Sequence, residues 1–223
     1  MMKLRSVATI GTIAGTLVLS ASAHAWVYTT TAQYGSWSGG GYTVGNDIWS
    51  GEGNQTLYVN SGSNWELISN NMTGGGVKAY GNSAYYPNYS NLNGACTSYF
   101  EGSSNASAYD MAYDIWTDSY VDEIMLWEDW TSNVGPIGSE IASNVTVGGN
   151  TWNIYRGNTG HNVVSLLSTS KKYNGTNNVQ AIMQYLNSKG WLSSATLYEV
   201  AFGYEITDGS NAESYTSSYS VTL

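Results

Sequence analysis

The chain has 223 residues, a formal net charge of −9 and only 10% charged residues, with nineteen tyrosines and nine tryptophans against two phenylalanines. The shortage of Lys and Arg argues against nucleic acid as a partner, because phosphate contacts need clustered cations. Low charge combined with abundant Gly, Ser, Thr and Asn favours strands and turns over surface helices. Coiled coils and nucleotide-binding α/β folds are therefore excluded.

The first 25 residues have the layout of a secretory signal peptide. Lys3 and Arg5 precede an uncharged, mostly apolar stretch at residues 7–19, and Ala23-His24-Ala25 forms a small-x-small cleavage site. The alternative, a membrane-spanning helix, needs about 20 apolar residues, and this stretch is shorter. We therefore expect cleavage after residue 25 and a secreted, extracellular protein with no membrane partner. The remaining residues, 26–223, are expected to form a single domain with a net charge of −11, from five Lys and Arg against 16 Asp and Glu.

Short β-rich segments follow one another along the chain after residue 25, separated by clusters of Gly, Asn and Ser. A dozen short strands at this spacing predict two packed antiparallel sheets in a sandwich or jelly roll. The expected strands are residues 26–33, 42–49, 55–60, 64–69, 77–80, 107–116, 120–127, 144–147, 151–156, 162–168, 197–206 and 212–222.

Residues 177–189 break this pattern and predict one amphipathic helix. Their apolar residues fall at i, i+3, i+4 and i+7, and Gly190 follows as a helix-ending residue. The apolar positions are Val179, Ile182, Met183 and Leu186. We expect this helix to pack on the β-sandwich.

Cys96 is the only cysteine, and His161 is the only histidine after residue 25. One cysteine excludes an intrachain disulfide and Cys-rich zinc sites, and one histidine excludes metal sites built from two or more His. A Ser-His-Asp triad would depend on His161 alone, and no GxSxG motif is present. The reactive chemistry that remains is that of carboxylates.

Alternation along the expected strands assigns several carboxylates to faces. Glu123 shares its face with Met125 and Trp127, where a carboxylate is costly unless it is hydrogen-bonded or functional. Glu205 shares its face with small residues, which would leave a floor flat enough for a bulky ring to approach. The shared faces are Asp110, Ala112, Asp114 and Trp116 in one strand, and Glu199, Ala201, Gly203 and Glu205 in another.

The ordinary interpretation of an acid on an outward sheet face is a solvated carboxylate. Glu123 and Glu205 differ from that case because their neighbours on the strand face are aromatic or very small. Two carboxylates with different surroundings match glycoside hydrolysis, which needs an ionised nucleophile and an acid with a raised pKa. The surplus of Trp would supply surfaces on which sugar rings stack.

The segment Glu123-Ile124-Met125-Leu126-Trp127 resembles the Glu-Leu-Met-Ile-Trp nucleophile motif of glycoside hydrolase family 12, endoglucanases with a β-jelly-roll fold. Other segments resemble family motifs in the same order, across nearly the whole chain after residue 25. They are Asn46-Asp47-Ile48-Trp49, Val77-Lys78-Ala79-Tyr80, Ala112-Tyr113-Asp114-Ile115-Trp116-Thr117, Gly135-Pro136-Ile137-Gly138-Ser139, and Val147-Gly148-Gly149 followed by Trp152-Asn153-Ile154-Tyr155.

The resemblance implies that Glu123 is the nucleophile and Glu205 the general acid/base, with Asp114 hydrogen-bonded to Glu123. It also implies that the substrate-binding residues are Trp49, Asn46, Met125, Trp127 and Pro136. Two features depart from the family pattern. Ile206-Thr207 stands where the family has Pro and an aromatic residue, and the cysteine pair of many members is absent.

The implied mechanism is retaining hydrolysis of β-1,4-glucan within the chain, with the two carboxyl groups about 5–5.5 Å apart. No metal or organic cofactor is required, and a monomer is expected. Cellulose-type and mixed-linkage glucans are the first choice of substrate, with xyloglucan as an alternative. Two other functions remain as alternatives. A non-catalytic carbohydrate-binding module would not need the two Glu residues, and a family 11 xylanase would lack the Met and Trp that follow Glu123.

Overall fold

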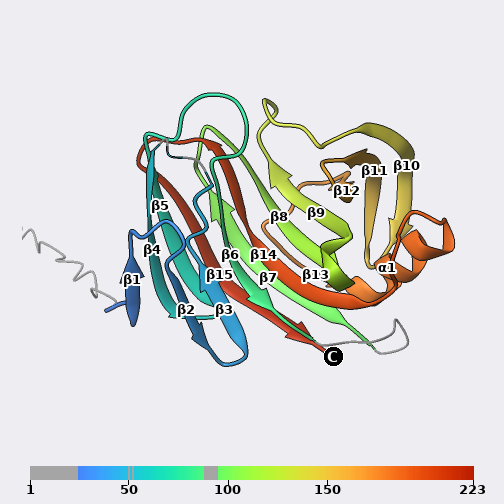
Figure 1. Ribbon diagram of the computed structural model, residues 1–223, viewed down its shortest axis with the longest axis horizontal. Helices are drawn as coiled ribbons and strands as arrows, with labels where there is room; N and C mark the ends of the chain where they lie inside the picture. Colours follow the sequence, from blue (N-terminus) through green and yellow to red (C-terminus); the bar gives the residue numbers. More distant parts are fainter. Residues whose placement is uncertain (1–24, 50, 52, 88–94) are drawn as a thin grey trace, which may run out of the picture.

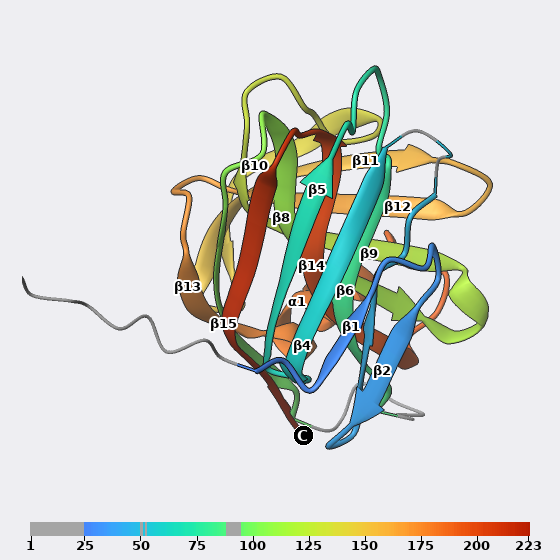
Figure 2. The same cartoon turned by 90° about the vertical axis from the view of Figure 1, so that its left-hand side faces the viewer.

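The computed structural model describes residues 25–49, 51, 53–87 and 95–223, so nearly all of the expected signal peptide lies outside the described residues. Two β-sheets pack face to face (Figure 1). The six-stranded sheet contains, in spatial order, β1 (Tyr28–Thr30), β4 (Asn54–Ser61), β5 (Asn64–Asn70), β15 (Ala212–Thr222), β7 (Thr97–Ser104) and β13 (Asn174–Asn178). Figure 2 shows β4, β5 and β15 side by side on the outside of the molecule.

The nine-stranded sheet forms the other layer. Its spatial order is β10 (Ser139–Val147), β11 (Asn150–Asn158), β12 (Asn162–Ser168), β9 (Asp122–Trp130), β8 (Ala108–Thr117), β14 (Leu197–Asp208), β6 (Ala79–Tyr85), β3 (Tyr42–Gly45) and β2 (Ser36–Gly39). Strands distant in sequence, such as β8 and β14, are therefore direct neighbours. The predicted all-β jelly roll with one helix is confirmed.

The core lies between the sheets and follows from the alternation of the strands. Ile124 and Leu126 of β9 point into it, together with Tyr113 of β8 and Phe202 of β14. Each large apolar side chain that is fully buried contributes about 1.5–3 kcal/mol to folding. Since successive residues point to opposite faces, the residues between these core positions lie on the outer face of the nine-stranded sheet.

Helix α1 (Val179–Ser188) buries the four apolar residues predicted for it and packs against β10 and β7. It begins later than expected because residues 174–178 form β13 and pair with β7. Asn178 caps its first turn, with the side-chain oxygen accepting from Ala181 N at 2.9 Å. Gly190 ends it at φ +68°, a conformation that glycine adopts without strain. Within the described ranges, no helix has the length and apolar character needed to cross a bilayer.

Three strands were not expected from the sequence, and one pairing differs from the prediction. The sequences of β2, β7 and β13 are rich in Ser, Asn and Gly and carry little apolar alternation. The sheets were predicted to be antiparallel, but β12 runs parallel to β9, with Val163 opposite Glu123. A 3₁₀ turn at Asp118–Tyr120 also replaces the first residue of the strand expected at 120–127.

Candidate active site

The carboxylates singled out from the sequence lie on three adjacent strands. Glu123 comes from β9, Asp114 from β8 and Glu205 from β14, and all three line one cavity of about 710 Å³. The cavity lies on the face of the nine-stranded sheet that points away from the core. The strand faces predicted by alternation are therefore confirmed. The acids come together because β9, β8 and β14 are adjacent in the sheet, an order that the sequence alone did not predict.

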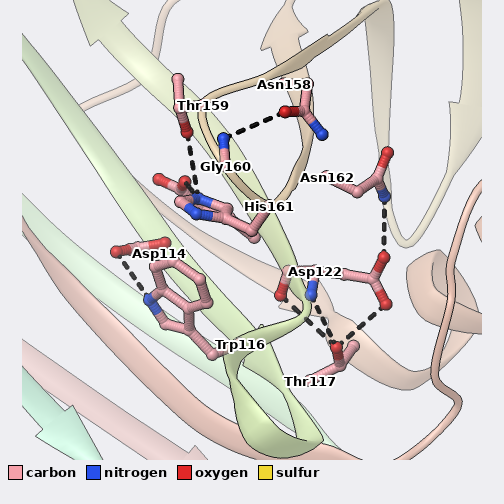
Figure 3. Close-up of polar contacts among 10 residues, drawn as sticks. Asp114, Trp116, Thr117, Asp122, Asn158, Thr159, Gly160, His161 and Asn162 are labelled. Atoms are coloured by element: carbon pink, nitrogen blue, oxygen red, sulfur yellow. Dashed lines mark hydrogen bonds and ion pairs between the residues drawn. The ribbon is translucent and has the colours of Figure 1, made fainter.

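Glu123 has a close partner that the sequence did not suggest. His161 Nε2 lies 2.5 Å from Glu123 Oε2, with 28% and 14% of the two side chains exposed. His161 directly precedes β12, and the parallel pairing of β12 with β9 places it beside Glu123. Figure 3 shows its ring between Thr159 and Trp116.

Asp114 does not make the expected hydrogen bond to Glu123. Because Asp114 pairs with Met125 and Trp116 pairs with Glu123, the two acids are diagonal neighbours across β8 and β9. Asp114 instead accepts a 3.0 Å hydrogen bond from Trp116 Nε1 (Figure 3). Burial raises the pKa of Asp114 well above its usual value, and the charges of Glu123 and Glu205 raise it further. The charges of the two glutamates thus favour the protonated form of Asp114.

Glu205 sits opposite Asp110, a second buried acid. The two residues are a cross-strand pair between β14 and β8, and their side chains share a hydrogen bond. Burial raises the pKa of Glu205 to about 7, with an added contribution from the charge of Glu123, while the hydrogen bond from Asp110 lowers it. The pKa of Asp110 is raised well above its usual value, first by burial and then by Glu205. Asp110 therefore keeps its proton and donates a hydrogen bond to Glu205.

The sequence predicted an open floor of small residues beside Glu205, but this floor is covered. Tyr80 of β6 covers it, packing on Ala84 and Ala201, and its hydroxyl donates to Ala112 O at 3.2 Å. The ring reaches from β6 across β14 to β8, since β14 lies between those two strands. The expected position of a substrate ring is thus taken by the side chain of Tyr80, which contacts β6, β14 and β8.

Tryptophan side chains and one methionine form part of the cavity wall. Trp49 is 48% exposed, Met125 and Trp127 are nearly buried, and all three contribute to the lining. Trp127 Nε1 is buried without a hydrogen-bond partner among the described residues. Trp116 adds a third tryptophan to the lining. These surfaces suit the apolar faces of sugar rings.

Two residues assigned to substrate binding do not line the cavity. Asn46 is fully buried, and its Nδ2 donates to Ala32 O at 3.0 Å and to Gln55 O at 3.1 Å. An amide with both protons engaged by the backbone holds loops together and does not reach a ligand. Pro136 is absent from the lining, although its neighbours Gly135 and Ile137 belong to it.

The sequence interpretation missed three residues of the site: His161, Asp110 and Trp116. Alternation had placed Asp110 and Trp116 on the face of Asp114, so a signal was present but no role was given to them. His161 carried no such signal. Its position depends on the parallel pairing of β12 and β9, which local sequence does not encode.

Asp122 fixes the start of β9, next to Glu123. Its carboxylate accepts hydrogen bonds from Ser193 N and Ser194 N at 2.9 Å and from Asn162 Nδ2 at 2.8 Å. Thr117 Oγ1 donates to the same carboxylate at 3.0 Å (Figure 3). Burial alone would raise the pKa of Asp122, but these hydrogen bonds lower it below its usual value. One carboxylate thus joins β8, β9, β12 and the segment before β14.

Comparison with known proteins places this site in a family. The family model described as glycosyl hydrolase family 12 matches residues 40–223. The chain is 33% identical over 218 residues to a probable xyloglucan-specific endo-beta-1,4-glucanase A of Aspergillus terreus, with 86% of each chain covered.

Solved structures agree with this match. The xyloglucanase domain of NopAA, a type three effector from Sinorhizobium fredii, in complex with cellobiose, has a TM-score of 0.84 and 34% identity, covering 88% of this chain and 98% of that one. A native family 12 xyloglucanase from Bacillus licheniformis has a TM-score of 0.79 and 26% identity, covering 87% and 99%. The resemblance inferred from the motifs is confirmed, and the chain belongs to glycosyl hydrolase family 12.

Proposed function

We propose that this glycoside hydrolase is a retaining endo-β-1,4-glucanase in which Glu123 is the nucleophile and Glu205 the general acid/base. The observation that carries the proposal is the cavity in which both glutamates lie on one sheet face in different surroundings. Glu205 is partly buried, and desolvation raises its pKa to about 7, which suits an acid that must hold a proton near neutral pH. Glu123 Oε2 lies within hydrogen-bond distance of His161 Nε2, at 2.5 Å, which suits a carboxylate that must attack.

The reaction follows from these roles. Glu205 donates its proton to the glycosidic oxygen while a carboxylate oxygen of Glu123 forms a bond to the anomeric carbon, and the C–O bond to the leaving sugar breaks. Glu205, now ionised, takes a proton from water, which attacks the anomeric carbon and releases Glu123. Asp110 lowers the pKa of Glu205 through its hydrogen bond, and Asp114 lies diagonally opposite Glu123 on the neighbouring strand.

Azide separates the two roles. In Glu205→Ala the nucleophile remains, so an activated aryl β-cellobioside should still form the glycosyl-enzyme, and azide, which needs no general base, should release the β-azide. In Glu123→Ala azide should attack directly and give the α-azide. The opposite anomers would mean that the two roles are exchanged. A binding module would hold glucan with either glutamate removed and would never have cleaved it.

We infer that xyloglucan is the preferred substrate, ahead of the cellulose-type glucans favoured by the sequence alone. The support comes from the relatives, which are named as xyloglucan-specific enzymes. Initial rates of reducing-sugar release from xyloglucan, carboxymethyl cellulose, lichenan and xylan test the order. The highest rate on xyloglucan is expected, and a rate on xylan above those on all three glucans would contradict the proposal.

We also propose that the protein acts outside the cell as a monomer, with a signal peptide over residues 1–25 and a catalytic domain over 26–223. The support is the charged, apolar and small-residue layout at the start of the chain. N-terminal sequencing of exported protein should begin at Trp26, and light scattering should give the mass of one chain. Exported protein that still began at Met1 would contradict the signal peptide.

A further inference from the structure

The contact between His161 and Glu123 depends on a tight turn between β11 and β12. Within that turn, Gly160 N donates to Asn158 Oδ1 at 3.0 Å (Figure 3). Thr159 N donates to His161 O at 3.1 Å. Gly160 has φ +101°, which a residue with a side chain rarely adopts. The backbone therefore holds the imidazole in place before any substrate arrives.

The imidazole is also held from its sides. The ring of Trp116 lies 4.8 Å away, centroid to centroid, and Thr159 Oγ1 lies 3.3 Å from Nε2. Glu123 Oε2, at 2.5 Å, is much the closer partner of that nitrogen. An ionised carboxylate only accepts hydrogen bonds, so a contact of this length requires the proton on Nε2.

We propose that His161 is a positioning residue for the nucleophile: its Nε2–H holds Oε2 of Glu123 so that Oε1 is presented to the anomeric carbon. The inference rests on the proposed function. In the first step Oε1 forms the bond to the anomeric carbon, and Oε2 becomes the carbonyl oxygen of the glycosyl ester, still facing Nε2–H. In the second step water displaces the ester, the electron pair of the C–Oε1 bond returns to the carboxylate, and the hydrogen bond to His161 is retained.

The ordinary alternative is that the contact has no role in catalysis, as many partly exposed ion pairs have no measurable effect. The two interpretations differ in what removing the donor does. A pair without a role leaves kcat unchanged, whereas a positioning pair is needed for the attack itself. Substitution of His161 therefore distinguishes them, provided that the proton donated by Glu205 does not limit the rate.

The test uses 2,4-dinitrophenyl β-cellobioside, whose leaving group needs no proton, with wild type, His161→Leu and His161→Gln. The Gln amide reaches about as far as Nε2 and keeps an uncharged donor, whereas Leu removes the donor. For Leu we expect kcat to fall at least about tenfold with KM within about threefold, less than the 10²–10³ loss for an oxyanion-hole donor. Gln should retain at least about a third of the wild-type kcat. A Leu variant with wild-type kcat, or a Gln variant as slow as Leu, overturns the proposal.

A spectroscopic test adds a measurement on the wild-type chain, for which no question of folding arises. His161 is the only histidine after residue 25, so the ring-nitrogen signals of ¹⁵N-labelled processed protein need no assignment. Glu123→Gln should shift the Nε2 signal, and trapping wild type with an activated 2-deoxy-2-fluoro-cellobioside should shift it too, because the carboxylate becomes an ester. An Nε2 signal unchanged by both overturns the contact. Wild type that cleaves neither a glucan nor the aryl glycoside instead contradicts the proposed function.

Discussion

Glu205 and Asp110 face each other across β14 and β8, and two buried carboxyl groups at this range do not both ionise near neutral pH. Asp110 is almost fully buried and keeps the proton, and Glu205 faces the cavity with its pKa raised to about 7. At the scale of single residues, burial thus sets which acid is available to donate a proton to a leaving group.

The pH dependence of activity should reveal this acid. Because the pKa of Glu205 is raised to about 7, its proton is present below pH 7 and lost above it, so kcat/KM on glucan should fall as pH rises beyond 7. With 2,4-dinitrophenyl β-cellobioside the same fall should be absent, since that leaving group needs no proton. Rates measured from pH 4 to 9 on both substrates check this. An identical alkaline fall on both would contradict the assignment.

Asp110 should tune this acid through its hydrogen bond. The bond from Asp110 lowers the pKa of Glu205, so Asp110→Ala, which removes it, should move the alkaline fall of kcat/KM to higher pH. Asp110→Asn keeps a donor at the same position and should stay near the wild-type profile. An Asn variant that shifts as far as Ala would mean that packing, and not the hydrogen bond, sets the pKa.

At the scale of strands, local pattern and long-range pairing differ in what the sequence reveals. The faces of β8, β9 and β14 follow from period-two alternation, so Glu123, Asp114 and Glu205 could be placed on faces before the structure was known. The order of the strands, and the parallel pairing that brings His161 to Glu123, depend on contacts far apart in sequence. Asn46 shows the same limit. Its motif predicted a ligand contact, but in the fold its buried amide donates to the backbone oxygens of Ala32 and Gln55.

Asp122 should be the most sensitive polar residue outside the cavity. Asp122→Ala leaves the N–H groups of Ser193 and Ser194 without their acceptor and frees the segment before β14. We expect a loss of about 2–4 kcal/mol in the free energy of unfolding, measured by urea denaturation. Asp122→Asn keeps one oxygen and should lose less. Its lowered pKa adds a second expectation, that the stability from Asp122 disappears as pH falls through that pKa.

At the scale of the whole molecule, several acids are buried with raised pKa values. Glu128 lies between the sheets, where Asn177 Nδ2 donates to its Oε1 at 2.6 Å and its other oxygen has no partner among the described residues. Burial raises its pKa to about 7, against smaller lowering effects from Asn177 and Lys172. Burial likewise raises the pKa of Glu199 to about 7. The folded chain therefore holds protons that the unfolded chain has already released.

Stability should consequently fall as pH rises from about 4.5 to 7, because the folded state binds more protons than the unfolded state in that window. A shift of one pKa unit corresponds to about 1.4 kcal/mol, and about 1 kcal/mol moves the Tm of a domain of this size by about 2–4 °C. Between pH 5 and pH 8 the Tm should thus drop by at least about 5 °C, as measured by calorimetry.

Glu128→Gln tests the origin of that drop. The amide cannot ionise and keeps the contact with Asn177, so the variant should lose markedly less Tm between pH 5 and pH 8 than wild type does. The matched control is Glu140→Gln, a change at an exposed glutamate of β10 that contacts Tyr155, and it should leave the pH dependence as it is in wild type. If both variants kept the full drop, the proton uptake that sets the stability of the sandwich would have to come from the acids of the cavity, and Glu205→Gln would then be the variant that flattens the curve.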